Sequence, residues 1–552
     1  MSASGSSLAP ASMTASIQSA LEEKKSEAPL RFANFIRGDR LDLSSQRLES
    51  KDVADIIAVL NRHPTIRVVN LSSNKLGAEG AKEFAEKNEV ATTVFLNGNL
   101  IDAQGAKDFA VLNQVATTVD LSNNQIDDQG AKDFAELNQV ATTVYLRNIG
   151  MTAQGAKDFA ILNKIATTLD LSHNRLGDQG ALNFAEFNRF VTAVNLTQNN
   201  IGQQGARDFA VWNSRNKVAT SVNLSCNHLG DEGAIEFAEL NTIATTVNLG
   251  SNGIGRNGVK GFAMRNKTVL SVDFFNNPLI KEGAIDFAKL NQVAKKVSFS
   301  GCEIGIVGLI GFALWNMTAT KVDLSCNNLG GLGAKCFAIL NQTATELEFE
   351  INGMGAWGVI DFARLNRFAS TVNFAGNWIE DQGAKNFADL NRIATTVGMR
   401  RCGIGDFGAI ALMGSQNIVS LDVSNNKLIS EPMKRALEER IAQNRARYTG
   451  WAEVAMMVAA LRANEGNLDL GGYSDLIPEI LGFIGGGAAT KQGLFSFGSK
   501  NGSPEKIASA LFFRKLAAEA CVTPSEEKKQ PLEQAPSAVV RSGLDSFSRP
   551  GC

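Results

Sequence analysis

The sequence predicts an α/β solenoid of stacked repeats, and three observations support that fold class. A strand-like xLxL pattern returns every 25 residues in most of the chain, with intervals of 28 residues at the first and seventh steps and 24 at the last. Asn follows the strand in twelve of sixteen repeats, and Phe fills one helix position in thirteen. A fixed period of this length is typical of repeats that stack around one continuous core.

Each repeat can be explained from the stretch VDLSNNQIDDQGAKDFAELNQVATTV, residues 119–144. Val119 and Leu121 alternate with period two, so they should point inward from a short parallel strand. Ala131 and Phe134 follow at helical spacing, which places one face of a short helix on the same core. The period and the LxLxxNxI pattern are those of leucine-rich repeats.

Two sets of Asn recur in the repeats. The first follows the strand, where a buried turn needs partners for its backbone groups and an Asn amide supplies both donors and an acceptor. The second stands at the helix end, as at Asn138, where we expect a left-handed cap conformation. The first set comprises Asn74, Asn99, Asn124, Asn174, Asn199, Asn227, Asn252, Asn277, Asn327, Asn352, Asn377 and Asn426.

The repeats resemble the ribonuclease-inhibitor-like class of leucine-rich repeat proteins over residues 41–430. Within that class, the GA-x-x-F-A helix is most similar to the GALA-type repeats of bacterial effectors. The resemblance implies a horseshoe-shaped solenoid with a parallel β-sheet on the concave face and short helices on the convex face. GALA effectors usually carry an F-box before their repeats, whereas residues 1–40 contain no such motif.

Around the array we expect an atypical first repeat, with Lys51–His63 as an amphipathic helix, and a C-terminal cap of two helices, Glu431–Arg447 and Thr449–Ala463. Within the array, an insertion at 212–217 should lengthen one helix or its loop. The predicted organisation is a disordered leader at 1–29, an N-terminal capping repeat at 30–68, the repeat array at 69–430, a helical C-terminal cap at 431–465, a small helical appendage at 466–521 and a disordered tail at 522–552.

Composition limits the possible functions. Formal net charge is −2 and charged residues are 20%, so no strong field favours nucleic acid or a membrane surface. Apolar stretches are too short for a membrane span, and the N-terminus lacks a hydrophobic signal core. Seven scattered cysteines without a CxxC pair favour reduced thiols, and hence a cytoplasmic protein. The Ser- and Ala-rich leader leaves secretion into a host cell cytosol as an alternative.

Catalytic patterns are missing from the sequence. It contains no HExxH, no GxSxG and no GxxxxGK[ST], and it has three His in all. We therefore predict a protein without enzymatic activity, metal or cofactor.

The candidate binding site lies on the exposed face of the predicted sheet. Most repeats present small residues there, whereas charged and aromatic residues collect between positions 274 and 400. Because Leu347 and Phe349 must point inward, the three Glu between and beside them share the outer face. The predicted partner-binding residues are Phe275, Lys296, Lys321, Asp323, Glu346, Glu348, Glu350 and Arg400.

These features predict a non-enzymatic scaffold that binds a partner protein on the concave face. A first alternative is a bacterial effector that acts as a ubiquitin-ligase substrate adaptor. In that case LIPEILGFI and FFRKLAAEA, within residues 474–520, would form an F-box-like segment that contacts an adaptor subunit of the ligase. A second alternative is a GTPase activator of the Ran-type class, which uses the same repeat.

Overall fold

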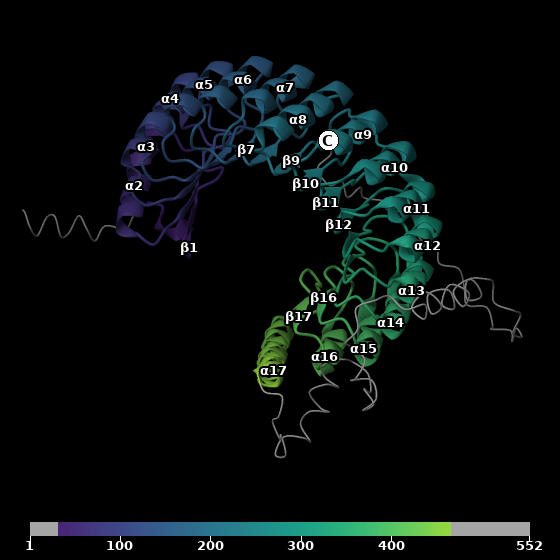
Figure 1. Cartoon of the computed structure of the whole chain (residues 1–552). Helices are drawn as coiled ribbons and strands as arrows, with labels where there is room; N and C mark the ends of the chain where they lie inside the picture. Colours follow the sequence, from purple (N-terminus) through teal and green to yellow (C-terminus); the bar gives the residue numbers. More distant parts are fainter. Residues whose placement is uncertain (1–30, 465–552) are drawn as a thin grey trace, which may run out of the picture. The chain divides into compact units, whose positions relative to one another are not determined.

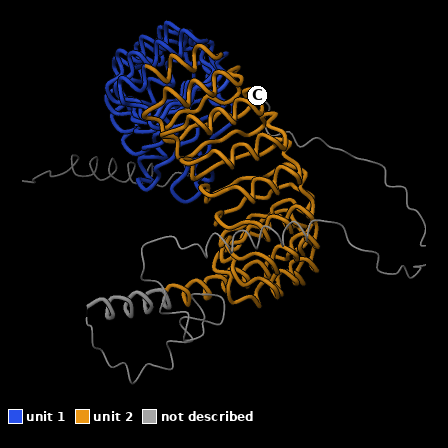
Figure 2. Tube along the Cα trace, turned by 45° about the vertical axis from the view of Figure 1, so that its right-hand side comes forward, with its two compact units in different colours: residues 1–200, 212–220 blue, residues 201–211, 221–552 orange. Residues whose placement is uncertain are grey.

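The computed structural model describes residues 31–464, with side chains described up to residue 449. The predicted leader, appendage and tail, including the F-box-like segment, lie outside the described residues. Short strands and helices alternate along the described chain, which confirms the α/β leucine-rich repeat solenoid (Figure 1). The chain divides into two compact units, residues 1–200 with 212–220, and residues 201–211 with 221–552 (Figure 2).

Unit 1 contains the first strands of the array. Strand β1 (Ile36–Arg37) pairs antiparallel with β2, and from β2 to β8 each strand pairs in parallel with the next. These strands are β2 (Arg40–Asp42), β3 (Val68–Asn70), β4 (Thr93–Phe95), β5 (Thr118–Asp120), β6 (Thr143–Tyr145), β7 (Thr168–Asp170) and β8 (Ala193–Asn195).

Unit 2 contains the later strands, which also pair in parallel and in chain order. They are β9 (Ser221–Asn223), β10 (Thr246–Asn248), β11 (Ser271–Asp273), β12 (Lys296–Ser298), β13 (Lys321–Asp323), β14 (Glu346–Glu348), β15 (Thr371–Asn373), β16 (Thr396–Gly398) and β17 (Ser420–Asp422). Corresponding residues of neighbouring strands are direct partners, so side chains at one strand position form a row across the sheet.

A helix follows each strand from β2 onward, and successive helices pack on one another from α2 to α7 in unit 1 and from α9 to α17 in unit 2. The helices are α2 (Val53–Arg62), α3 (Gly77–Lys87), α4 (Ala103–Leu112), α5 (Asp127–Leu137), α6 (Ala153–Leu162), α7 (Gly177–Phe187), α8 (Gln203–Asn216), α9 (Gly230–Leu240), α10 (Arg256–Arg265), α11 (Ile280–Leu290), α12 (Gly305–Trp315), α13 (Gly330–Leu340), α14 (Gly355–Leu365), α15 (Glu380–Leu390), α16 (Asp406–Gly414) and α17 (Glu431–Asn464). The predicted insertion lengthens α8 to 14 residues, against 11 in α9.

The core lies between the strands and the helices, as the alternation predicted. Val119, Leu121 and the helix residue Phe134 are buried. In unit 2 several strands carry Phe in place of Leu, and these rings interleave with the helix Phe. Phe274, for example, meets the Phe262 ring edge to face at 5.2 Å between centroids.

The ladder of Asn that follows the strands is confirmed. The side-chain amide of Asn252 donates to the carbonyl of Leu249 in its own repeat, at 3.0 Å, and to that of Leu224 in the preceding repeat, at 2.9 Å. Its Oδ1 accepts the Leu229 amide at 3.3 Å. Each ladder Asn therefore satisfies buried backbone groups in two repeats, which ties neighbouring repeats together.

Left-handed backbone occurs one residue before the ladder Asn, at Asn123 and His173 for example, and not at the second set of Asn, as at Asn138. The predicted left-handed cap is wrong, because Asn113 is extended, with φ −67° and ψ 115°. Its side chain bridges a turn instead, since Oδ1 accepts the Ala116 amide and Nδ2 donates to the Ala116 carbonyl, both at 2.8 Å. Asn recurs here because its amide can make both bonds at once.

Two predicted elements differ in detail. Lys51–His63 is split into a short 3₁₀ turn, Ser50–Asp52, followed by α2. The two predicted C-terminal helices are one helix, α17, which runs through Gly450. A single glycine costs a helix only about 1 kcal/mol, which does not break it when both flanking segments favour helix.

We propose that the start of α17 caps the array. Leu437 and Ile441 are buried against the last repeat, and Asn444 Nδ2 donates to the carbonyls of Ser415 and Ile418, both at 2.9 Å. A chain that ends at Asn426 should therefore expose the open end of the core and aggregate. Light scattering of the purified truncated protein checks this, and a soluble monomer would contradict the capping role.

Candidate functional site

The candidate site is a hollow of about 520 Å³ on the sheet face of unit 2, which we call the acidic hollow. It crosses strands β9 to β14, and its charged lining comes from β11 to β14 and the turns after them. Hydroxyl and amide side chains of the small strand residues complete the wall. The charged lining residues are Asp273, Lys296, Lys321, Asp323, Glu348 and Glu350.

Strand register explains why these residues meet. Lys296 is the direct partner of Lys321, which in turn is the partner of Glu346. In the same way Asp323 is the partner of Glu348 on the next strand. The intervening Leu347 is buried, so the outward direction of the Glu side chains is confirmed.

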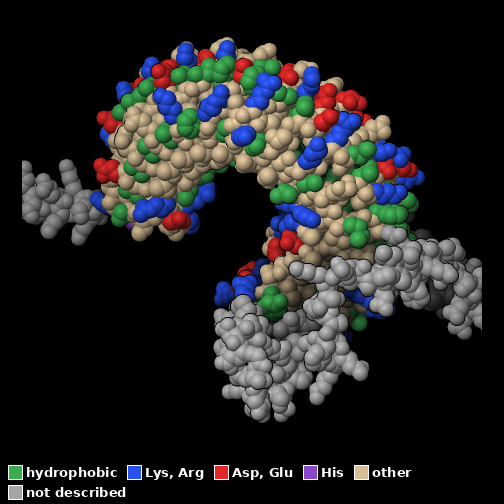
Figure 3. Space-filling model, in the orientation of Figure 1, with side chains coloured by type: hydrophobic (Ala, Val, Ile, Leu, Met, Phe, Trp, Pro, Cys, Tyr) green, Lys and Arg blue, Asp and Glu red, His purple; other side chains and the backbone are tan. Residues whose placement is uncertain are grey.

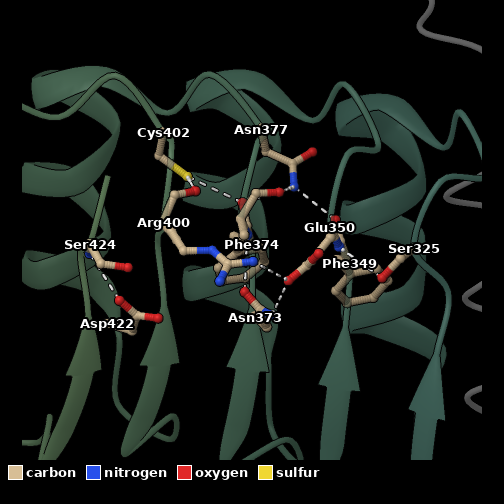
Figure 4. Close-up of polar contacts among 11 residues, drawn as sticks. Ser325, Phe349, Glu350, Asn373, Phe374, Asn377, Arg400, Cys402, Asp422 and Ser424 are labelled. Atoms are coloured by element: carbon tan, nitrogen blue, oxygen red, sulfur yellow. Dashed lines mark hydrogen bonds and ion pairs between the residues drawn. The ribbon is translucent and has the colours of Figure 1, made fainter. Parts of the chain in front are cut away.

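Two of the three predicted Glu are neutralised by neighbouring repeats. Lys321 Nζ lies 2.9 Å from Glu346 Oε2, and this hydrogen bond raises the pKa of Lys321. Glu350 Oε1 accepts the Asn373 amide at 2.8 Å and lies 3.8 Å from Arg400 Nη2 (Figure 4). Repulsion among the three carboxylates is therefore compensated within the protein at Glu346 and Glu350.

Glu348 differs from its neighbours. It is half-buried, and among the described residues it has no ion pair within 4.0 Å. Burial raises its pKa, as does the nearby charge of Asp323, whereas Asn373 and Lys321 act in the opposite direction. A partly desolvated carboxylate without a cation is the kind of group that a basic ligand stabilises.

Asp273 is a second carboxylate of this kind, and the sequence interpretation missed it. Burial raises its pKa, and so does the charge of Asp323, while the Phe275 amide donates a hydrogen bond at 3.0 Å that lowers it. Asp273 occupies the same strand position as Asp323 and Glu348. An acidic residue at that position in three of four consecutive repeats was a signal that could have found it.

Three predicted residues lie outside the hollow. Glu346 and Arg400 serve as the ion-pair partners described above, at its edge. The Phe275 ring packs over Gly250 of the preceding repeat, where a Cβ atom would lie 2.0 Å from the ring. Phe275 therefore has a packing role that also explains the glycine.

The raised pKa of Glu348 makes a prediction about stability. A carboxyl whose pKa is higher in the folded state than in the unfolded state stabilises the fold at low pH, and this contribution is lost as pH rises through the folded pKa. Glu348→Gln should therefore raise the melting temperature at pH 7, by an amount that shrinks toward pH 4. The matched control is Glu346→Gln. This change removes the ion pair with Lys321, so it should not raise the melting temperature. A melting temperature of Glu348→Gln at or below wild type at pH 7 would contradict this.

The cysteines in the ladder offer no nucleophile. Burial raises the pKa of Cys302 to about 12 and that of Cys402 to about 11. Each thiol instead replaces a ladder Asn and donates to a backbone carbonyl, that of Phe274 or Phe374. These two thiols are free.

Within residues 31–464, no helix has both the length and the apolar character needed to cross a membrane. In the same range, no three His, Cys, Asp or Glu side chains group in a way that could hold a metal ion.

Comparison with known proteins agrees with this architecture. A search of curated proteins finds no match. A solved structure that matches is described as the crystal structure of the Rad7 and Elc1 complex in yeast, at 12% identity and a TM-score of 0.37, over 77% of this chain and 96% of that one. A family model described as "Leucine Rich repeat" matches residues 62–85, 117–135, 167–185, 187–210, 220–238 and 316–338. Six stretches of this chain are thus leucine-rich repeats, and its fold is the leucine-rich repeat solenoid.

Proposed function

We propose that this protein is a non-enzymatic scaffold that binds a partner protein through the acidic hollow of unit 2. The observation that carries the proposal is Glu348, a half-buried carboxylate without an ion pair among the described residues. Folding alone does not favour a carboxylate there, because the Asn373 hydrogen bond and the charge of Lys321 offset only part of the free energy that its burial costs. Binding of a cationic side chain would recover that cost.

The partner chemistry follows from the lining. Four carboxylates and two lysines line the hollow, so its formal charge is negative. The hollow is large enough for one or two side chains, and the rows of residues across parallel strands suit an extended segment. We therefore infer a partner segment with Lys or Arg, which should enter between Asp273, Asp323 and Glu348. Lys296 on the rim would pair with an acidic residue of the same segment.

The described residues give no support to the two alternative functions. The F-box-like segment lies outside the described residues, and no arrangement of described residues points to a GTPase. The scaffold function is therefore the one that we carry forward.

The experiment is capture by the immobilised full-length chain. We expect wild type to retain a protein with a basic segment and to release it as salt is raised from about 0.1 M to about 1 M, where charges are screened beyond about 3 Å. Glu348→Lys should retain less of the same protein, while Asp120→Lys, at the equivalent strand position in unit 1, should retain as much as wild type. Equal retention by Glu348→Lys and wild type would contradict the proposed function.

A further inference from the structure

A second surface of unit 2 lies on its helix side and is apolar. Each helix from α3 to α16 contains a glycine near its start, and the residue preceding this glycine lies on the surface. In nine successive repeats that residue is polar: Glu79, Gln104, Gln129, Gln154, Gln179, Gln204, Glu232, Asn257 and Glu282. The next five are Val307, Leu332, Trp357, Gln382 and Phe407.

The four apolar residues at this position are strongly exposed. Val307 is 59% exposed, Leu332 60%, and Trp357 and Phe407 are each 81% exposed. Nothing in the core accounts for large apolar side chains here, because Gln fills the same position in other repeats of the same fold. We call Val307, Leu332, Trp357 and Phe407 the apolar row.

Close helix packing makes the row continuous from Val307 to Trp357, and Gln382 of α15 separates these three residues from Phe407. Helices α13 and α14 approach through Gly331 and Gly358, where a Cβ on Gly358 would lie 2.5 Å from the Gly331 Cα. Their neighbours in sequence, Leu332 and Trp357, are therefore adjacent on the surface. Helix α12, which carries Val307, packs on α13 and has no charged residue at all. In Figure 3, hydrophobic side chains are visible on the exposed surface around α11 and α12.

Exposed apolar surface of this kind marks a docking site, and the same chain contains an unassigned apolar segment that can reach it. Residues 503–520, SPEKIASALFFRKLAAEA, carry a helix-start signal and five large apolar residues, Ile507, Leu511, Phe512, Phe513 and Leu516. A second apolar segment, residues 476–484, is closer in sequence to the end of α17. The reach of the chain distinguishes the two segments.

Helix α17 starts beside the row, since the Ser430 amide donates to Asp406 Oδ1 at 2.8 Å. Its 34 residues span about 51 Å, so residue 464 lies roughly that far from Phe407. The row extends over four helix-to-helix spacings, from α16 to α12, and these add about 40 Å to the distance that the chain must cover. Twelve residues, the distance to residue 476, extend at most about 40 Å, whereas the 39 residues to Ser503 extend about 130 Å. Residues 503–520 can therefore cover the whole row, and residues 476–484 cannot.

We propose that residues 503–520 bind the apolar row of their own chain. The contact would bury Trp357 and Phe407 under Phe512, Phe513 and Leu516, and it would keep the row from binding other apolar surfaces. It uses the helix side of unit 2, so it stands independently of the acidic hollow.

Hydrogen exchange of the full-length chain tests the proposal. In wild type, amides of residues 503–520 should exchange at least about tenfold more slowly than in the fourfold variant Val307→Gln, Leu332→Gln, Trp357→Gln and Phe407→Gln. Because Gln occupies this position in other repeats, the variant should keep its fold, and its melting temperature verifies this. The matched control is Val111→Gln, Ile161→Gln, Phe190→Gln and Met264→Gln, four exposed apolar residues outside the row. In this control variant, the amides of residues 503–520 should exchange as slowly as in wild type.

The reciprocal variant, Leu511→Gln with Phe512→Gln, should speed exchange at the starts of α12, α13 and α14. The exchange rates of residues 503–520 and of the starts of α12, α13 and α14 should not depend on protein concentration, since the contact is within one chain. Equal exchange of residues 503–520 in wild type and the row variant would overturn the proposal. Protection that appears only at high concentration, together with a doubled mass in light scattering, would also overturn it and would assign the row to a second copy.

Discussion

Replacing Phe374 with Ala should destabilise unit 2 by about 3–5 kcal/mol, the range for a fully buried aromatic ring. Phe374 is fully buried and stacks on Phe349 with 6.3 Å between centroids and 8° between planes. It also meets Phe362 and Phe387 edge to face, at 5.3 Å and 5.8 Å. Alanine would leave a cavity among three rings from two neighbouring repeats, and it would remove the aromatic contacts as well as buried area.

Urea denaturation followed by circular dichroism measures this loss. The matched control is Phe368→Ala, the same substitution at an exposed position in the turn between α14 and β15, which should stay within about 1 kcal/mol of wild type. Coincident unfolding midpoints for the two variants would show that the interleaved rings do not hold the repeats together.

Replacing Asn252 with Ala should cost about 1–3 kcal/mol, because it leaves buried backbone groups without hydrogen-bond partners. The carbonyls of Leu224 and Leu249 would lose their donor, and the Leu229 amide would lose its acceptor. Two of these groups, the Leu224 carbonyl and the Leu229 amide, belong to the preceding repeat. The loss should therefore weaken the interface between repeats as well as one turn.

The comparison is with Lys132→Ala, an exposed helix change that should stay within about 0.5 kcal/mol. Unfolding midpoints in urea again give the answer. A midpoint for Asn252→Ala equal to that of Lys132→Ala would mean that the Asn ladder has no energetic role.

The regular part of the fold could be predicted from the sequence because its signals repeat. Val119, Leu121 and Phe134 recur at a fixed spacing, and one repeat explains the strands and helices of nearly all. What the pattern could not give was conformation at a single residue. The side chain of Asn113 forms the hydrogen bonds of a turn while its backbone is extended. The left-handed backbone conformation occurs instead one residue before the ladder Asn.

The site was predictable in part for the same reason. Strand alternation correctly placed Glu348 on the outer face, since Leu347 had to be buried. The ion pairs were not predictable in this way, because Lys321 and Glu346 stand 25 residues apart and only the register and side-chain conformations bring them together. Asp273 was missed because the sequence interpretation looked for departures from small residues, and Asp is common at that strand position.

For the apolar row, the sequence contained a signal that the sequence interpretation did not use. Val307, Leu332 and Trp357 stand at one repeat position where earlier repeats carry Gln or Glu. A position-by-position comparison of the repeats exposes this change. The exposure of those side chains, which turns the change into a surface, comes from the structure alone.

The most direct test of the central claim is the affinity of the captured partner for Glu348→Lys and Asp120→Lys, measured over a series of salt concentrations. Both residues occupy the same strand position, and burial raises the pKa of each. The account predicts that Glu348→Lys weakens binding by about 10- to 100-fold, or about 1.4–2.8 kcal/mol, and flattens its salt dependence, because a buried cation would face the partner's basic segment. Asp120→Lys should leave the affinity and its salt dependence unchanged. Equal affinities and equal salt dependence for the two variants would contradict the assignment of the acidic hollow as the partner site.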